Sequence, residues 1–266
     1  MTISSVAAVA GLPSATVAAN VTERDVMVRT GDGMADAAMF HPAGAGSWPA
    51  VLMWPDILGL RPAFRDMGRR LAAAGYTVLV PNPFYRTRRA PVVTGAFDFN
   101  DPKQRDAIMS LRATLTDAGI AKDAAAFITF LDRQRATNRR KGAGVQGYCF
   151  SGPFAFQTAA VRSDRIRAVG TFHGGGLVTK EASSPHLLIP KTKASFVVAI
   201  ARNDDQKQPD AKGILKASFA AAKRRAVVEV FPADHGWCVP GSQTYDQPSA
   251  ERAWAELLRL YRTRLV

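Results

Sequence analysis

Cysteine and histidine are scarce in this chain: its 266 residues include two cysteines and four histidines. The two cysteines, Cys149 and Cys238, lie far apart and match neither the spacing of a zinc site nor that of a disulfide framework. We therefore expect a protein of a reducing compartment with no metal site.

Long apolar runs are also missing. No run approaches the roughly 18 apolar residues that a membrane span requires. The stretch Met1–Asn20 is small and apolar, but no Lys or Arg precedes Arg24, so it lacks the basic region of a secretion signal. We expect a loose tail over residues 1–20 and a cytoplasmic location.

No linker rich in Gly, Ser or Pro divides the rest of the chain, and no internal repeat is visible. Hydrophobic residues make up 47% of the chain and charged residues 21%, with four Trp and 14 Phe, so a sizeable core can form. A single α/β sheet often fills a chain of this length. We expect one domain over residues 21–266.

Basic residues are in excess, with 35 Lys and Arg against 22 Asp and Glu, which gives a net charge of +13. Such a charge suits an anionic partner or substrate. Much of the excess lies in two clusters, Arg86/Arg88/Arg89 and Arg133–Lys141, and charge runs usually mark solvated faces. The chain shows no nucleic-acid-binding motif and no aromatic residues interleaved with these clusters. We expect no nucleic-acid or membrane partner. The alternative to an enzyme is a non-catalytic module that binds a polyanion.

Short apolar runs alternate with longer amphipathic segments along the chain. This alternation predicts an α/β fold, with a mostly parallel central sheet and helices on both faces. The irregular stretch Pro81–Pro102 is a long connection of the kind that often carries binding residues. The expected strands are Val26–Arg29, Ala35–Phe40, Pro49–Trp54, Tyr76–Val80, Gly144–Tyr148, Ile166–Phe172, Ser195–Ala201 and Ala226–Phe231. The expected helices are Arg61–Ala74, Lys103–Thr116, Lys122–Gln134, Gly152–Val161, Pro209–Ala222 and Ser249–Arg262.

Residues 145–152 read Val-Gln-Gly-Tyr-Cys-Phe-Ser-Gly, the outline of a nucleophile elbow built around Cys149. In an elbow the strand turns sharply into a helix, and the central residue takes a strained conformation that only small neighbours tolerate. Gly147, Ser151 and Gly152 are small enough. A thiol at a helix N-terminus is favoured as the thiolate, which is the form that attacks carbon. The alternative is a buried apolar cysteine in a strand-to-helix turn.

A thiol nucleophile needs a base and a group that orients the base. His235 follows the last expected strand and precedes the last helix, which is where an α/β-hydrolase carries its base. The orienting acid should follow the strand Ser195–Ala201, where Asp204 and Asp205 are adjacent. Counting from the strand end favours Asp204, and counting back from Pro209 favours Asp205. We assign Asp204 and keep Asp205 as the alternative.

The cysteine elbow, the late Asp and the final His together resemble the dienelactone hydrolase family. The family elbow reads Gly-Tyr-Cys-Leu-Gly-Gly where this chain has Gly-Tyr-Cys-Phe-Ser-Gly at 147–152, and the match runs from about Arg24 to the C-terminus. The resemblance implies an α/β-hydrolase fold. The chain shows no metal site and no dinucleotide fingerprint, so we expect no cofactor. The resemblance also implies Cys149 as nucleophile, Asp204 as orienting acid, His235 as base, and the backbone N–H groups of Ile57 and Phe150 as the oxyanion hole.

Three positions test this resemblance further. Asp56 stands where the family has a Glu that helps to activate the thiol, and its alternative reading is a cap before a helix. Arg86 corresponds to a family Arg that grips the substrate carboxylate, with Arg88 as a neighbour that could help. Val239 stands where the family has a second Arg. One arginine should hold an anionic lactone less tightly than two, and the second Arg is also missing as a partner for Asp56.

These observations predict a cysteine-dependent hydrolase of a small ester or lactone, with an acyl-thioester on Cys149. The alternative is a thioesterase or another esterase on the same fold, with an uncharged substrate. The segment His173-Gly174-Gly175-Gly176 resembles the oxyanion loop of lipases, but it follows the nucleophile instead of preceding it, so we expect its glycines to serve packing. We expect a monomer or a weak homo-oligomer.

Overall fold

An eight-stranded sheet forms the centre of the molecule; this computed structural model describes residues 20–266. The predicted tail over residues 1–20 lies outside the described residues except for Asn20. The strand order is β1-β2-β4-β3-β5-β6-β7-β8, in which β2 pairs antiparallel with β1 and β4 and all other pairs are parallel. The strands are β1 Val21–Thr30, β2 Gly33–Pro42, β3 Ala50–Trp54, β4 Thr77–Pro81, β5 Ala143–Tyr148, β6 Ile166–Phe172, β7 Ser195–Ala201 and β8 Ala226–Phe231. The helices are α1 Pro62–Ala73, α2 Pro102–Ala113, α3 Asp117–Asp132, α4 Gly152–Val161, α5 Arg202–Lys207, α6 Ala211–Ala221 and α7 Gln247–Arg264, with 3₁₀ turns η1 Cys149–Ser151 and η2 Pro185–Lys191.

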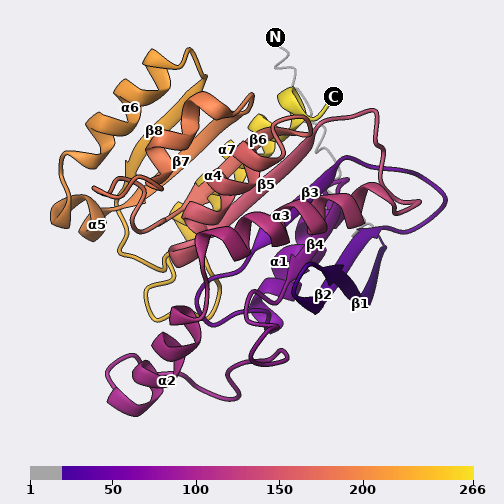
Figure 1. The fold of residues 1–266 in the computed structure, drawn as a ribbon, viewed down its shortest axis with the longest axis horizontal. Helices are drawn as coiled ribbons and strands as arrows, with labels where there is room; N and C mark the ends of the chain where they lie inside the picture. Colours follow the sequence, from indigo (N-terminus) through magenta and orange to yellow (C-terminus); the bar gives the residue numbers. More distant parts are fainter. Residues whose placement is uncertain (1–19) are drawn as a thin grey trace, which may run out of the picture.

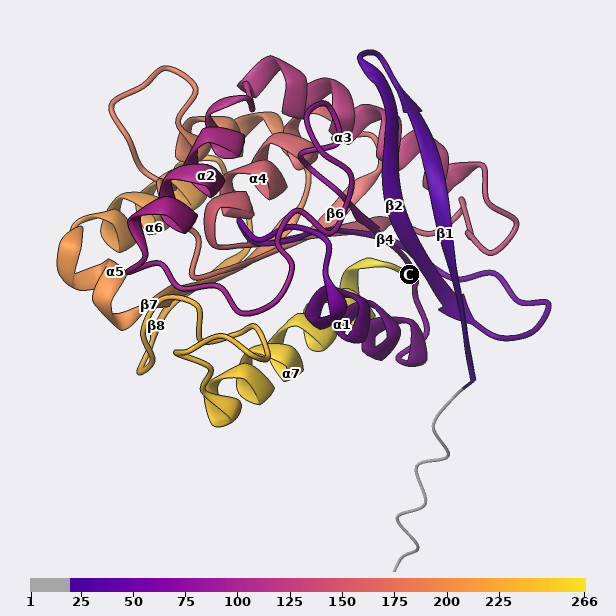
Figure 2. The ribbon, with the colours of Figure 1, turned by 90° about the horizontal axis from the view of Figure 1, so that it is seen from below.

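Helices cover both faces of the sheet. Figure 2 shows α1 and α7 on one face and α3, α4 and α6 on the other, and each face has its own hydrophobic core. The central strands are buried on both sides, and every residue of β3 and β4 is buried. This explains their continuous apolar sequences, which are typical of parallel strands between two helical layers. None of the helices in residues 20–266 is long and apolar enough to cross a membrane.

All eight predicted strands are present, and the sequence underestimated the first two. They form a hairpin of two ten-residue strands that pairs from Val21 with Pro42 to Thr30 with Gly33. Much of β1 is exposed or half-buried, so apolar periodicity does not reveal its full length. The helix predicted from Lys122 begins earlier, at Asp117, because the Thr116 side chain accepts a hydrogen bond from the Gly119 N–H and caps the first turn.

Three short helical segments were not predicted: α5 and the 3₁₀ turns η1 and η2. Helix α5 has six residues directly after β7 and contains no buried residue, so it lacks the apolar stripe by which a helix is recognised in a sequence. It is nevertheless important, because Asp204 and Asp205 both lie in its first turn.

The carboxyl ends of the parallel strands lie at one edge of the sheet, where α/β proteins usually bind their ligands. Asp56 follows β3, Cys149 follows β5, Asp204 follows β7 and His235 follows β8. Figure 1 shows α2 standing apart from the helical layers on this side of the molecule. The topology thus brings these residues, distant in sequence, to one region.

Candidate active site

Cys149 lies in the sharp turn between β5 and α4, with a φ of 56°. A non-glycine residue in this left-handed region is strained, as the central residue of an elbow is. Its neighbours have no room for larger side chains. A Cβ atom on Gly147 would lie 2.2 Å from the Ser151 carbonyl oxygen, and one on Gly152 would lie 2.6 Å from Thr171 Oγ1. Gly147 is therefore required by the turn itself, and Gly152 by the close approach of Thr171 and Gly174.

Ser151 contributes more than small size. Its buried Oγ accepts a hydrogen bond from the Tyr148 N–H at 2.9 Å and lies 3.1 Å from the Trp54 carbonyl oxygen at the end of β3. This hydroxyl ties the elbow to the strand that precedes Asp56 and Ile57. The sequence showed only that Ser151 was small.

His235 and Asp204 are in direct contact. His235 Nδ1 lies 2.6 Å from Asp204 Oδ2. The backbone of His235 is held as well, because its N–H donates to Asn203 Oδ1 at 2.8 Å and its carbonyl accepts from Thr244 Oγ1 at 2.6 Å. Asp205 points elsewhere and forms an ion pair with Lys212 Nζ at 2.7 Å. Of the two adjacent carboxylates, the structure brings Asp204 to the imidazole.

The surroundings of His235 favour its protonated form. Burial alone would lower the pKa of the imidazole, but hydrogen bonding to Asp204 and interaction with the Cys149 thiol raise the pKa to about 10. At neutral pH the ring therefore carries a proton. Such an imidazolium is suited to stabilise a thiolate and then to protonate a leaving group.

This raised pKa predicts how stability depends on pH. Stabilisation by the His235 proton is complete below pH 6.5, the usual pKa of histidine, and is lost as the pH rises through about 10. We expect the free energy of unfolding of the native protein, relative to His235→Gln, to decrease between pH 6.5 and 10. Urea unfolding of both proteins at pH 6, 8 and 10 measures this difference in unfolding free energy. A difference that stays constant across these pH values would contradict the ion-paired arrangement.

His173 is a neighbour of this pair to which the sequence assigned no role. It is 1% exposed, its φ is 41°, and its ring centroid lies 5.0 Å from that of His235 in an edge-to-face arrangement. Neither ring nitrogen has a hydrogen-bond partner within the described residues. Burial, together with the nearby His235, holds the pKa of His173 well below its usual range, so the ring stays neutral. It packs against His235 without adding a competing charge.

The following glycines fulfil the expected packing role in part. A Cβ atom on Gly174 would lie 2.5 Å from Thr171 Oγ1 and 3.3 Å from Gly152 Cα, so the chain passes close to the elbow helix here. Gly176 has a φ of 67°, and Gly175 has open space around it. Only Gly174 is thus needed for close approach.

The backbone N–H groups of Ile57 and Phe150 lie in the two turns that meet at the elbow. Neither donates to a partner among the hydrogen bonds of residues 20–266. The Phe150 N–H is in the first turn of η1, where helical N–H groups have no acceptor within the helix. Both residues belong to an apolar cluster with Phe84, whose ring stacks on that of Phe150 at a centroid distance of 5.8 Å. The cluster also includes Leu58, Val92, Val93, Phe97, Ile108, Leu111 and Leu115.

Asp56 forms a two-pronged ion pair with Arg61, a residue that the sequence did not single out. The two oxygen–nitrogen distances are 2.5 and 2.8 Å, and Asp56 Oδ1 also accepts a hydrogen bond from the Leu58 N–H at 3.0 Å. Arg61 thus supplies the positive partner that Val239 cannot provide. No hydrogen bond joins Asp56 to Cys149 in the described part of the chain. Thiol activation by Asp56 stays a prediction.

Arg86 is engaged by two carboxylates. Its Nη1 and Nη2 donate to the two oxygens of Asp123 at 2.7 and 2.8 Å, while Nε and Nη2 donate to Asp32 Oδ2 at 3.1 and 2.7 Å. Four of the five guanidinium donors are therefore used, although a two-pronged grip on a substrate carboxylate needs two free donors. Substrate binding by Arg86 stays a prediction, and these ion pairs compete with it.

The ion pairs lead us to expect a stability effect at Arg86. The Asp123 side chain is fully buried, and burial raises its pKa against the opposing effect of Arg86 and Tyr85. Arg86→Met should cost about 3 kcal/mol of unfolding free energy, the lower end for breaking a buried ion pair, because it leaves a buried carboxylate without its partly exposed cation. Denaturant unfolding measures this cost, and Asp123→Asn added to Arg86→Met should recover part of it. A KM increase confined to carboxylated substrates, with unchanged stability, would instead support the carboxylate clamp.

A family model described as the dienelactone hydrolase family matches residues 35–265. The chain belongs to the dienelactone hydrolase family. Among its curated relatives is carboxymethylenebutenolidase 1 of Cupriavidus pinatubonensis, which is 27% identical over 215 residues, covering 80% of this chain and 86% of that protein.

Solved structures agree on the fold. A dienelactone hydrolase-like promiscuous phosphotriesterase from metagenomic libraries superimposes with a TM-score of 0.74 at 21% identity, covering 92% of this chain and 99% of that one. The dienelactone hydrolase of Anabaena variabilis gives a TM-score of 0.63 at 18% identity, with the same coverage. The predicted α/β-hydrolase fold is confirmed, and the chain is a dienelactone hydrolase-like hydrolase.

Proposed function

We propose that this member of the family hydrolyses a small ester or lactone through an acyl-thioester on Cys149. The observation that carries the proposal is the 2.6 Å contact between His235 and Asp204 beside an elbow whose central residue is a strained cysteine. Nucleophilic acyl transfer requires a nucleophile, a base beside it and an acid that orients the base.

In the proposed reaction the Cys149 sulfur attacks the carbonyl carbon, and the Ile57 and Phe150 N–H groups stabilise the resulting oxyanion. The tetrahedral intermediate collapses and breaks the carbon–oxygen bond, while the His235 imidazolium gives its proton to the departing alkoxide. Water then attacks the thioester carbonyl carbon while one of its protons passes to His235. The second tetrahedral intermediate breaks the carbon–sulfur bond, which releases the carboxylic acid and the Cys149 thiolate. Cys149 and His235 return to their starting state.

Two observations favour an uncharged substrate. Arg61 and Arg86 are each paired with an aspartate, and Val239 offers no donor. The residues expected to form the oxyanion hole belong to an apolar cluster that includes Phe84 and Phe150. A neutral acyl or aryl group can bury apolar surface there, whereas a carboxylate would have to give up its hydration. Arg88, exposed at the edge of this cluster and without a carboxylate partner among the described residues, is the cation that could meet such a carboxylate.

The test is turnover of matched small aryl esters and unsaturated lactones, each with and without a carboxylate. We expect the neutral member of each pair to have the higher kcat/KM, and mass spectrometry of the quenched enzyme to find the acyl group on the peptide that contains Cys149. An acyl group on any other residue, or no turnover of any ester or lactone, would refute the proposed function.

A further inference from the structure

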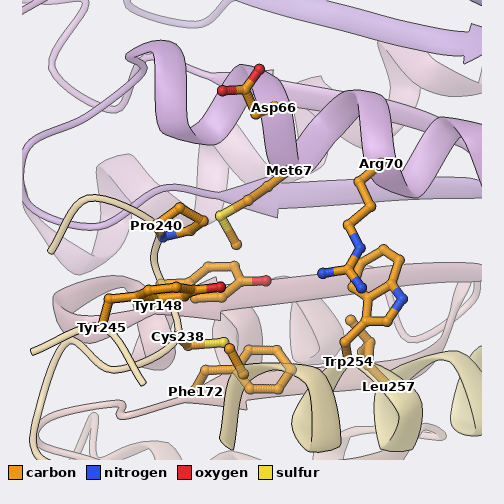
Figure 3. A pocket seen from close by; sticks show the side chains of 11 residues that line it. Asp66, Met67, Arg70, Tyr148, Phe172, Cys238, Pro240, Tyr245, Trp254 and Leu257 are labelled. Atoms are coloured by element: carbon orange, nitrogen blue, oxygen red, sulfur yellow. The ribbon is translucent and has the colours of Figure 1, made fainter. Parts of the chain in front are cut away.

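A cavity of about 120 Å³ lies behind the loop that carries His235. Figure 3 shows its walls: Met67 and Arg70 of α1 face Trp254 and Leu257 of α7 across the cavity. The remaining lining residues are Asp66, Tyr148, Phe172, Cys238, Pro240, Tyr245 and Ala250. Cys149 is not among them, so this cavity is distinct from the proposed reaction site.

The walls of the cavity are mostly apolar and rich in aromatic rings. Burial raises the pKa of both Tyr148 and the Cys238 thiol, which keeps both groups protonated. The charged side chains are already paired: Arg70 holds both carboxylate oxygens of Glu251 and stacks on Trp254 at 4.3 Å, while Asp66 pairs with Arg69. An ion would therefore find no free counter-charge, whereas an apolar ring would gain contact with other rings.

One polar group is available inside this apolar space. The Tyr148 hydroxyl, on a residue that is 2% exposed, accepts a hydrogen bond from Gln146 Nε2 at 2.8 Å. The amide oxygen of Gln146 is taken by the Tyr261 hydroxyl, also at 2.8 Å. The proton of the Tyr148 hydroxyl thus has no acceptor among the described residues, and a buried donor gains from finding one.

We propose that this cavity binds a small uncharged aromatic molecule with one acceptor oxygen, with phenol as its simplest representative. The volume of about 120 Å³ is of the order that a single ring requires, since an apolar cavity of about 150 Å³ binds benzene in another protein. The ring packs among Tyr148, Phe172 and Trp254, and its oxygen accepts the hydrogen bond of the Tyr148 hydroxyl.

The site is connected to His235 through its own wall. Cys238, Pro240 and Tyr245 belong to the segment between His235 and α7, and Thr244, next to Tyr245, donates to the His235 carbonyl at 2.6 Å. Tyr148 directly precedes Cys149. A ligand in the cavity therefore packs against the segments that hold the base and the nucleophile, from the side away from the reaction.

Calorimetric titration with phenol, and with toluene for comparison, tests the proposal. Filling the cavity from opposite walls with Ala250→Leu or Met67→Phe should weaken phenol binding at least tenfold, whereas Ala217→Leu, on the exposed side of α6, should not change it. Tyr148→Phe should remove the preference for phenol over toluene, which we expect to be about five- to tenfold for one hydrogen bond.

The titration is repeated after alkylation of Cys149, which separates this site from the reaction site. Phenol binding that persists on the alkylated protein supports the second site, and it does so even if no ester is ever turned over. Three results would overturn the proposal: no phenol binding to the native protein, binding of phenol by both filled variants as tightly as by the native protein, or loss of binding on alkylation. If one of the two filled variants does not fold, phenol binding by the other variant tests the proposal.

Discussion

Cys149→Ala is expected to abolish ester hydrolysis, lowering kcat by about 10⁴-fold or more while the protein stays folded. A side chain that forms the covalent intermediate cannot be replaced by its neighbours, and removal of a triad nucleophile in other hydrolases leaves only the contribution of binding and the oxyanion hole. Alanine also fits the site sterically, because it keeps the Cβ atom of Cys149 and lacks only the sulfur. Steady-state turnover of a neutral aryl ester, together with circular dichroism, measures both parts.

Cys238 provides the internal control for this prediction. Its thiol is buried and its pKa is raised, so it should react slowly with an alkylating agent, because the thiolate is the reactive form. One equivalent of iodoacetamide should therefore label Cys149 first, and activity should fall in step with that label. Cys238→Ala should keep the activity and the labelling rate. If labelling at Cys238 accounted for the loss of activity, the elbow would not hold the nucleophile.

The elbow could be predicted from the sequence because its requirements are local. The turn demands small residues at fixed distances from Cys149, and at Gly147 a Cβ atom would lie 2.2 Å from the Ser151 carbonyl oxygen of the same turn. The same holds for the strands β3 and β4, whose complete burial leaves a continuous apolar run. Local chemistry and strand order together were enough to locate Cys149 and His235 in the fold.

The partners of the charged residues could not be predicted, because they depend on segments that meet only in three dimensions. Arg86 meets Asp32 from the β1–β2 turn and Asp123 from α3, and none of the three is marked as a partner by its spacing. Asp56 and Arg61 are close in sequence, but the family pattern places the second arginine after His235. The arginine that pairs with Asp56 instead directly precedes α1. The family motifs thus located the site residues in the chain, but they did not predict the ion pairs that these residues form.

The choice between Asp204 and Asp205 shows the same limit at the scale of one residue. Counting along the chain left the two carboxylates nearly equivalent, because the short helix α5 has no sequence signature. In the structure both lie in its first turn, but successive residues of a helix point in different directions, so only one can face His235. The other pairs with Lys212 on the next helix.

Asp204→Asn is expected to lower kcat by about 10⁴-fold, because the asparagine amide no longer fixes the tautomer of His235 or stabilises its positive charge. It should also lower the pKa of His235, since the hydrogen bond to Asp204 is the largest of the contributions that raise it. Asp205→Asn removes the same charge one residue away, and we expect less than a threefold change in kcat, because it loses only a partly exposed ion pair with Lys212. Turnover of one neutral ester by both variants, combined with an NMR titration of the His235 ring, distinguishes the two positions. Equal decreases in kcat for the two variants would mean that the negative charge of the first turn of α5 matters, not the contact with the imidazole. A larger decrease for Asp205→Asn would reverse the assignment of the orienting acid.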